Sequence, residues 1–328
     1  MGNRLARLVS SACVCTSALL CLFLFACYAL RPDSCAAITA LPVWAWLLPG
    51  LALASPAIGL RRRRMALALA ALWLCYLLVF GQEPRSLARA LWAPSSEKAG
   101  GYAIRVISLN CAGGDASAAA EVAPYHPDIL LLQEAPPAEK ADEMGREWFG
   151  AEAVMISGWD TAILARGELI TGPARSASHF TWARIRLPSG SEIVLVSVRL
   201  SPPSLRFDLW SSECWREQAR VRHVHRTEMA DVALALRDAA RGVPVVVGGD
   251  FNAPGGDGIF RSLGPRMSDA FREAGRGWGN TVSNECPVLR FDQVWVSKDV
   301  PVVNVVARKT QHSDHRMVIC DLELGPEP

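Results

Sequence analysis

The sequence predicts an α/β domain of two β-sheets with helices outside, preceded by three membrane-spanning helices. The distribution of charge divides the chain in two: residues 1–99 carry ten Lys/Arg against three Asp/Glu, whereas residues 100–328 carry 24 against 29. Short apolar runs bounded by turn residues recur in the second part, which is typical of strands. This composition excludes a disordered chain, a collagen-like chain and a small disulfide scaffold.

Three uncharged stretches form the predicted membrane anchor, which covers residues 1–81. Residues 8–30 are long enough to cross a bilayer, which takes about 20 apolar residues. Residues 36–60 contain three prolines, which membrane helices tolerate better than soluble helices do. Residues 65–81 are short, but the arginines before them can reach the membrane surface. A cleaved signal peptide is the alternative for the first stretch, and the two stretches that follow favour the anchor.

The placement of arginines predicts the orientation of this anchor. Arg4 and Arg7 precede the first stretch, and residues 61–64 are four consecutive arginines between the second and the third. Positive residues favour the cytoplasmic side, so three crossings place the chain after residue 82 outside the cytoplasm. The sequence therefore predicts a multi-pass protein of the cell (inner) membrane with an extracytoplasmic C-terminal domain.

Residues 82–101 are predicted to be a linker, because Pro, Ser and a Gly-Gly pair interrupt them. Within this stretch, residues 85–92 fit either an amphipathic turn on the membrane surface or a plain solvated segment.

Strands and one long helix are predicted beyond the linker. The helix covers about residues 213–241 and ends at Gly242. The strands fall at residues 103–109, 128–133, 161–165, 180–187, 192–200, 243–248, 291–297, 302–307 and 317–324. A chain rich in strands with few helices of this size predicts two sheets with helices outside.

The ten cysteines are not spaced as zinc ligands. Six lie in the anchor, where they act as small apolar residues. Four are scattered through the domain, and one or two disulfides among them are allowed without a preferred pairing.

Polar side chains follow or precede several of the predicted strands. Each one alone fits ordinary turn chemistry, but together they form a set of acidic and amide side chains with one histidine: Asn110, Glu134, Asp250, Asn252, Asp292, Asp314 and His315. Carboxylate and amide oxygens suit a hard cation such as Mg²⁺, and a histidine oriented by an aspartate suits proton transfer or phosphate contact. Metal-assisted hydrolysis fits this set best.

The order of these motifs resembles the endonuclease/exonuclease/phosphatase superfamily. The motifs are SLN ending at Asn110, LLQE ending at Glu134, GGDFN at residues 248–252, RFDQVWV around Asp292, and SDH at residues 313–315. The match covers about residues 102–324, so residues 102–328 are expected to be the catalytic domain. The resemblance implies a four-layer α/β sandwich and hydrolysis of a phosphoester with Mg²⁺ or Mn²⁺. The three N-terminal stretches and the run at 267–281 look like a membrane-anchored bacterial branch of the superfamily.

The resemblance also implies roles for the residues that match. Glu134 would ligate the metal, with Asn110 beside it and Asp314 completing the metal region.

Four further residues would carry out the reaction. Asp250 would orient or deprotonate the attacking water, and Asn252 would hold the phosphate or the water. His315 would contact the scissile phosphate, with Asp292 fixing its tautomer.

Two positions are expected to contact substrate. Arg199 stands at the end of a predicted strand where the family often has a histidine; it can grip a phosphate with two hydrogen bonds, or it can be a surface residue. Thr281 ends a Gly-Trp-Gly-Asn-Thr run that fits a substrate-side loop or a plain turn.

Two neighbouring segments bear on the substrate. Residues 216–226 are rich in Arg and His and fit a solvated face or a grip on an anionic headgroup. The aromatic residues of 207–215 fit either contact with the bilayer or internal packing.

Three functional hypotheses remain. The first is a membrane-tethered phosphatase or phosphodiesterase acting on a phospholipid or a lipid-linked phosphate, since tethering concentrates the site at its substrate. The second is an extracytoplasmic endonuclease or exonuclease on DNA or RNA, which the net charge of −5 in residues 100–328 disfavours. The third is a catalytically decayed binding protein, for which Arg199 is the one supporting feature.

Overall fold

The computed structural model describes residues 2–56, 63–92, 102–173, 177–240 and 242–324. These divide into two compact units. The apolar unit combines Met1–Arg85 with Leu205–Arg220, and the α/β unit combines Ser86–Ser204 with Val221–Pro328. The long helix α9, Ser212–Ala239, therefore begins in the apolar unit and continues in the α/β unit.

Two helices of the apolar unit are long and apolar enough to cross a membrane, namely α1 (Gly2–Leu30) and α5 (Arg63–Phe80). The expected span at residues 36–60 is not one continuous helix. It consists of short pieces that bend by 81° between Thr39 and Val43, so the described residues hold two candidate spans, or three if the bent pair counts as one. The break falls at Pro42, which lacks a backbone N–H and disfavours a helical residue before it.

The pieces of this bent segment are η1 (Asp33–Cys35), α2 (Ala36–Thr39), η2 (Val43–Trp46) and α3 (Leu47–Ala54). Residues 57–60 of the expected span, and two of the four arginines after it, lie outside the described residues.

Helices α1 and α5 run in the same direction. The Phe25 and Phe80 rings near their C-terminal ends lie 4.7 Å apart, and Val14 and Leu69 in their N-terminal halves share a second apolar cluster with Ala54 of α3. Because parallel spans must be joined by a segment that returns, α3 is the part of the chain that runs back between them.

The return segment is packed closely against both spans. Ser17 on α1 donates a hydrogen bond to the carbonyl of Gly50 at 2.8 Å and accepts one from the Trp73 indole at 3.0 Å. A Cβ at Gly50 would lie 2.0 Å from the Trp73 ring, so only glycine allows this approach.

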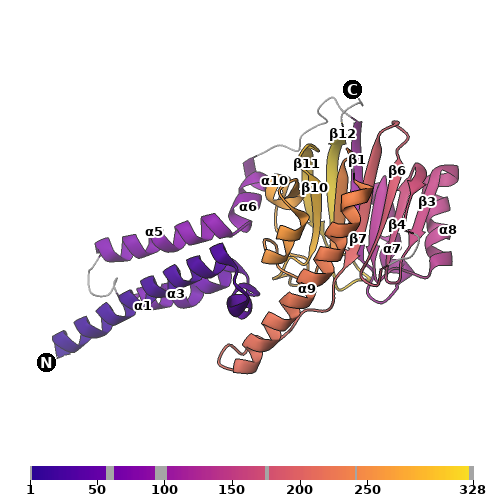
Figure 1. The fold of residues 1–328 in the computed structure, drawn as a ribbon. Coiled ribbons are helices and arrows are strands. Elements are labelled where there is room, and N and C mark those ends of the chain that lie inside the picture. The colour runs from indigo at the N-terminus through magenta and orange to yellow at the C-terminus, as the bar shows by residue number, and fades with distance from the viewer. Residues whose placement is uncertain (1, 57–62, 93–101, 174–176, 241, 325–328) are drawn as a thin grey trace. The chain divides into compact units, whose positions relative to one another are not determined.

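The α/β unit contains two mixed six-stranded sheets flanked by helices, as the sequence predicts (Figure 1). The first sheet has the order β11-β12-β1-β2-β4-β3, and the second has the order β5-β6-β7-β8-β10-β9. The strand bounds are β1 Tyr102–Asn110, β2 Ile129–Gln133, β3 Ala153–Ser157, β4 Thr161–Arg166, β5 Glu168–Thr171, β6 Phe180–Arg186, β7 Glu192–Arg199, β8 Val245–Asp250, β9 Met267–Asp269, β10 Asp292–Ser297, β11 Val302–Arg308 and β12 Met317–Leu324.

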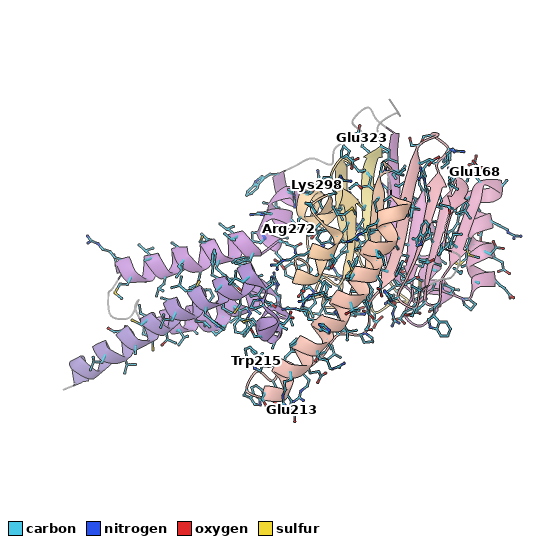
Figure 2. The ribbon with its side chains drawn as sticks, viewed as in Figure 1. Glu168, Glu213, Trp215, Arg272, Lys298 and Glu323 are labelled. Carbon is cyan, nitrogen blue, oxygen red and sulfur yellow. The ribbon has the colours of Figure 1, made fainter. Side chains whose placement is uncertain are left out.

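All nine predicted strands are present, and β3, β5 and β9 were not predicted. They lie at sheet ends, where short strands have fewer buried residues to reveal them. Strands β10 and β12 begin at one edge of the sandwich and run towards the opposite edge, which Lys298 and Glu323 mark (Figure 2).

Three apolar clusters hold the layers together. The first fills the space between the sheets, and its members include Val106, Leu131, Leu195 and Val246. The second packs α9 against the outer face of the second sheet. The third packs α7 (Ala116–Ala120) and α8 (Ala138–Phe149) against the outer face of the first sheet. Burial of alternate strand faces on both sides therefore produces the four layers.

Helix α6, Glu83–Trp92, lies in the first part of the stretch expected to be a linker, where the sequence fits either an amphipathic turn or a solvated segment. Its Arg89 donates to the carbonyls of Phe271 and Arg272 at 3.2 Å, and residues 93–101 lie outside the described residues. All ten cysteines are free, so the allowed disulfides do not form. Of the four in the domain, Cys111, Cys214 and Cys320 are buried and Cys286 is exposed.

Gly249 provides a test of strand packing. A Cβ there would lie 1.9 Å from the Val198 carbonyl oxygen, at a φ of 157°. We expect Gly249→Ala to lower the free energy of unfolding by more than about 2 kcal/mol. Relieving the clash would require β7 and β8 to move apart, which would break the hydrogen bonds between them. Thermal unfolding of the detergent-solubilised chain measures this.

Gly145→Ala is the matched control. Gly145 lies inside α8, where a Cβ meets its nearest neighbour at 3.6 Å. Alanine favours a helix interior by about 0.5–1 kcal/mol over glycine, so this variant should unfold at the same or a higher temperature. Equal losses in the two variants would contradict the explanation.

Candidate active site

The candidate site lies where strand ends of the two sheets meet. Strands β1 and β2 are parallel, with Asn110 opposite Gln133 at their C-terminal ends. In the second sheet β7 and β8 are parallel and β10 is antiparallel, so Asp250 lies between Arg199 and Asp292. This topology brings residues far apart in the sequence to one edge of the sandwich.

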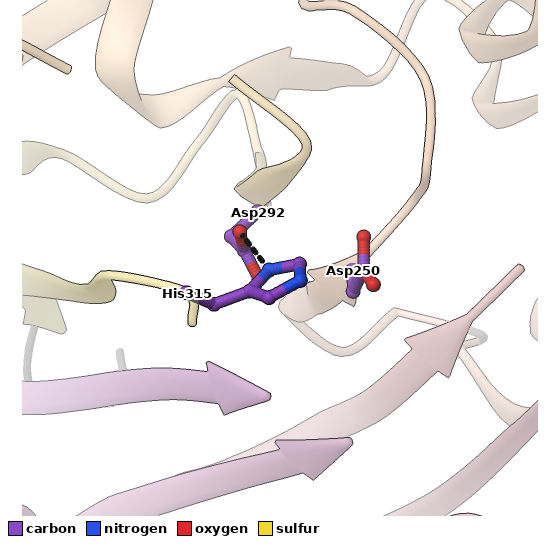
Figure 3. Close-up of side chains that lie close together, drawn as sticks. All are labelled: Asp250, Asp292 and His315. Atoms are coloured by element: carbon purple, nitrogen blue, oxygen red, sulfur yellow. Dashed lines mark hydrogen bonds and ion pairs between the residues drawn. The ribbon is translucent and has the colours of Figure 1, made fainter. Parts of the chain in front are cut away.

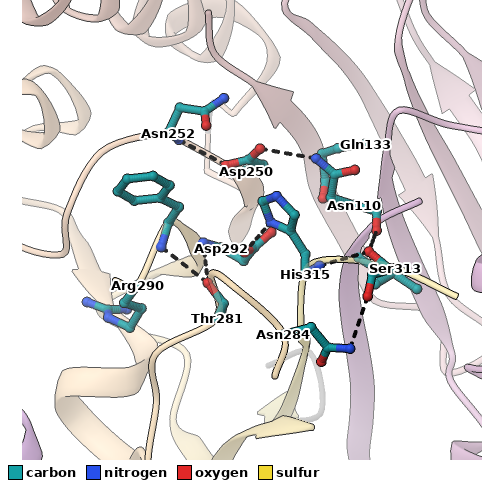
Figure 4. A network of polar contacts seen from close by, with 12 residues as sticks. Asn110, Gln133, Asp250, Asn252, Thr281, Asn284, Arg290, Asp292, Ser313 and His315 are labelled. Atoms are coloured by element: carbon teal, nitrogen blue, oxygen red, sulfur yellow. Dashed lines mark hydrogen bonds and ion pairs between the residues drawn. The ribbon is translucent and has the colours of Figure 1, made fainter. Parts of the chain in front are cut away.

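Asn110 links the two sheets at this edge. Its side-chain Nδ2 donates to Glu134 Oε1 and to Asp250 Oδ2, each at 3.1 Å, while its Oδ1 accepts from the backbone N–H of Ala112 at 2.9 Å. Asn110 is completely buried, so these bonds form without competition from bulk water (Figure 4). The amide therefore fixes the separation of the two carboxylates.

Glu134 is half-buried and surrounded by donors. Arg199 donates to Glu134 Oε1 at 2.7 Å, the backbone N–H of Gly113 donates to Oε2 at 2.5 Å, and Arg199 also pairs with Asp160. Burial alone would raise the pKa of the Glu134 carboxyl, but the hydrogen bond from Asn110 and the charge of Arg199 lower it below its usual value. Glu134 is therefore an anion held in one place.

Asp292 and His315 form a buried pair. His315 Nδ1 lies 2.8 Å from Asp292 Oδ2, and the other ring nitrogen is turned towards Asp250 (Figure 3). Burial opposes protonation of the imidazole, yet the charge of Asp292 and its hydrogen bond raise the pKa of His315 to about 10. At neutral pH the ring is an imidazolium.

The surroundings of Asp250 favour its protonated, uncharged form. Burial and the nearby charge of Asp292 raise the pKa of the Asp250 carboxyl to about 7, although His315 and the hydrogen bonds from Asn110 and the Asn252 N–H oppose this. One carboxyl that titrates near neutrality therefore stands beside a charged imidazolium, an arrangement suited to proton transfer.

The backbone at this edge is held by two hydroxyls (Figure 4). Ser313 Oγ donates to the Asn110 carbonyl at 2.7 Å and accepts from the His315 N–H at 3.0 Å. Thr281 Oγ1 accepts from the N–H groups of Phe291 and Asp292, both at 3.2 Å. Thr281, expected on a substrate-side loop, is fully buried, so its side chain supports Asp292 from behind.

Two other expected residues differ in their relation to the central cluster. Asp314 is exposed, and its carboxylate is not part of the cluster of Asp250, Asp292 and His315 whose ligand atoms lie within 4.8 Å of one another. Asn252 is buried beside the cluster: its backbone N–H donates to Asp250 Oδ1 at 3.0 Å, and its Nδ2 donates to the Leu200 carbonyl at 2.9 Å, which ties the end of β8 to the end of β7.

Two contributors were missed from the sequence. Asp160 precedes β4 in a turn that carries no motif. Ser313 belongs to the SDH motif, in which the expected chemistry rests on Asp314 and His315 alone.

The donor set fits a divalent cation. Asp250, Asp292 and His315 form a buried cluster, and Asp292 Oδ1 is buried with no hydrogen-bond partner among the described residues. An orphaned buried carboxylate oxygen is costly unless something pairs with it. Oxygen-rich sites of this kind suit Mg²⁺ or Mn²⁺ better than soft metals.

The backbone is strained at two of these positions. Glu134 and Asn252 have φ values of 44° and 47°, in the left-handed region that non-glycine residues seldom adopt. Such strain is typical of functional sites, where the surrounding structure has to maintain it.

Comparisons with known proteins agree with this fold. The family model described as Endonuclease/Exonuclease/phosphatase family matches residues 107–315. A humanized TDP2 of D. rerio is 17% identical with a TM-score of 0.51, covering 68% of this chain and 99% of its own. An endonuclease/exonuclease/phosphatase of Bacteroides vulgatus is 16% identical with a TM-score of 0.52, also covering 68% and 99%. A truncated Caenorhabditis elegans TDP2 is 19% identical with a TM-score of 0.51, covering 68% and 98%. No curated protein sequence matches.

The His315–Asp292 pair predicts how stability depends on pH. A raised histidine pKa stabilises the fold fully below about pH 6.5, and that stabilisation is lost as the pH rises through about 10. We expect the metal-free wild type to lose on the order of 3 kcal/mol more than His315→Asn over this interval. Chemical denaturation at several pH values measures the difference, and parallel curves for the two proteins would contradict the charged pair.

Proposed function

The chain belongs to the endonuclease/exonuclease/phosphatase family, whose members hydrolyse phosphoester bonds, and from this premise we propose that it is a membrane-anchored, divalent-metal-dependent phosphatase or phosphodiesterase. Its substrate is a phospholipid or a lipid-linked phosphate, and its domain acts outside the cytoplasm. The observation that carries the chemistry is the buried arrangement of Asp250, Asp292 and His315.

Asp250 is the proposed base. Its pKa of about 7 lets its carboxylate accept a proton from an attacking water at neutral pH. The hydrogen bonds from Asn110 and from the Asn252 N–H aim the two carboxylate oxygens, so little reorganisation is needed before attack.

His315 is the proposed phosphate contact. Asp292 occupies its Nδ1, which leaves Nε2 as a charged donor towards the phosphoryl oxygens. A fixed imidazolium in a buried site stabilises the negative charge that develops there as the bond to the leaving group breaks.

Glu134, with Asn110 beside it, is the proposed metal ligand, and the unpaired Oδ1 of Asp292 is a further carboxylate oxygen available to the ion. A bound Mg²⁺ or Mn²⁺ would neutralise charge on the phosphoryl oxygens. Asn110 holds Glu134 in place, and Arg199 is available as a second cation at the same carboxylate. In this proposal Arg199 is a phosphate contact at the end of β7, with Asp160 restraining its other guanidinium nitrogen.

The apolar helices support the choice of a lipid substrate. Two or three spans confine the chain to the membrane plane, where a lipid phosphate is concentrated. The acidic net charge of the domain is poorly suited to a nucleic-acid backbone.

Removing the metal is expected to abolish activity. Chelation should stop phosphate release by the full chain in detergent, and Mg²⁺ or Mn²⁺ should restore it. Asp250→Asn and His315→Asn should each lower kcat by about 100- to 10,000-fold with the metal present. Arg146→Gln, which removes an exposed charge on α8, is the control. Full activity in chelator would disprove the metal requirement, and full activity of both site variants would favour a binding protein.

The substrate class is tested by parallel assays of the full chain on an isoprenyl diphosphate, a phospholipid and plasmid DNA. We expect the wild type to release phosphate or headgroup from a lipid and to leave the plasmid intact. Asp250→Asn should release neither phosphate nor headgroup. Nicked plasmid together with inert lipids would replace the lipid substrate by a nucleic acid and leave the hydrolase assignment in place.

A further inference from the structure

The second part of the segment between β7 and α9, together with the beginning of α9, belongs to the apolar unit. Leu205–Arg220 groups with the membrane helices, although it follows the site residue Arg199 by only six positions in the chain. Leu209 and Trp215, the latter on the first turns of α9 (Figure 2), pack against the cluster that contains Leu24, Tyr28 and Tyr76.

This contact involves one end of α1 and α5 and not the other. The cluster draws on the C-terminal halves of α1 and α5, from Leu20 to Tyr28 and from Leu72 to Phe80. The N-terminal halves pack in a separate cluster that excludes the segment. The segment therefore lies beside the C-terminal halves of α1 and α5.

The segment forms a turn with its own hydrogen bonds. The Trp215 indole donates to the Leu209 carbonyl at 2.8 Å, and Gln218 Nε2 donates to the Arg206 carbonyl at 2.9 Å. The Arg206 guanidinium pairs with Asp208 and Glu213, so its charge is balanced within the turn. The side chains that the turn presents are therefore held in place.

Apolar side chains of this turn are directed outward. Trp210 is 90% exposed and Leu205 is 76% exposed, with Phe207 partly exposed beside them. The spans next to it also present apolar side chains at this end, among them Leu30 and Val79. Large exposed apolar groups that continue a lipid-facing surface mark a membrane contact, and tryptophan favours the boundary between headgroups and acyl chains.

We propose that the turn Leu205–Trp210 is a membrane-contacting element that inserts Trp210, with Leu205 and Phe207, into the bilayer interface at the C-terminal ends of α1 and α5. The partner is the lipid surface. The inference rests on the proposed membrane anchor and is independent of the hydrolytic reaction. The chain that connects β7 to α9 would then contact the membrane together with the anchor helices.

Quenching by brominated lipid tests this contact. The full chain is reconstituted in phosphatidylcholine vesicles with or without bromine on the acyl chains near the headgroup. The fluorescence of Trp210 is obtained as the difference between wild type and Trp210→Phe. We expect bromine to reduce this signal at least about two-fold.

Trp159→Phe is the matched control. Trp159 is 85% exposed and lies in the α/β unit, before β4. Its difference signal is expected to respond to acrylamide in the water and not to bromine.

The outcomes separate the two proposals. If acrylamide quenches Trp210 and bromine does not, the membrane contact is wrong. If neither quenches Trp210, the contact is also wrong, and the result favours a protein partner such as a second copy. The remaining tryptophans of Trp210→Phe include Trp73 in α5 and report on the anchor itself. If bromine quenches none of them, the membrane anchor fails, and the contact with it.

Discussion

The polar edge of the sandwich depends on hydrogen bonds that one buried amide makes across two sheets. Asn110 ends a strand of the first sheet and donates to Asp250 at the end of a strand of the second. Gln133 makes a second crossing, because its Nε2 donates to Ser197 at 3.0 Å. Ser197 in turn donates to the Leu132 carbonyl at 2.8 Å, and Arg199 at the end of β7 donates to Glu134, which follows β2. Away from this edge the sheets meet through the apolar side chains of the central cluster, which do not fix register by themselves. The polar crossings therefore determine how the strand ends align.

That alignment determines the electrostatics. Two carboxyl groups and an imidazole are buried together, so each changes the protonation of the others. Burial, together with the charge of Asp292, raises the pKa of Asp250 to about 7; for His315 burial acts in the opposite direction, and the charge and hydrogen bond of Asp292 outweigh it and raise the pKa to about 10. On the other side of Asn110, Arg199 keeps Glu134 ionised. The same edge thus provides a proton acceptor, a cation and a fixed anion.

The apolar unit is stabilised by different interactions. Its helices approach one another closely at Gly50 and are linked by the Ser17–Trp73 hydrogen bond, and small residues with polar contacts of this kind are typical of packing between membrane helices. Its aromatic cluster includes Leu209 and Trp215, which come from beyond β7. The chain that follows β7 thus belongs partly to the α/β unit and partly to the apolar unit. A division of the sequence at residue 101 does not predict this.

Local patterns in the sequence predict the strands with buried faces, the long helix and the motifs at strand ends, because hydrophobic periodicity and turn residues are local properties. They could not determine that Thr281 faces inward, that Asp314 is exposed, or that Asp160 holds Arg199. Those outcomes depend on which strand ends are neighbours. Tertiary structure alone decided this, since strand order and register between two sheets follow from long-range packing.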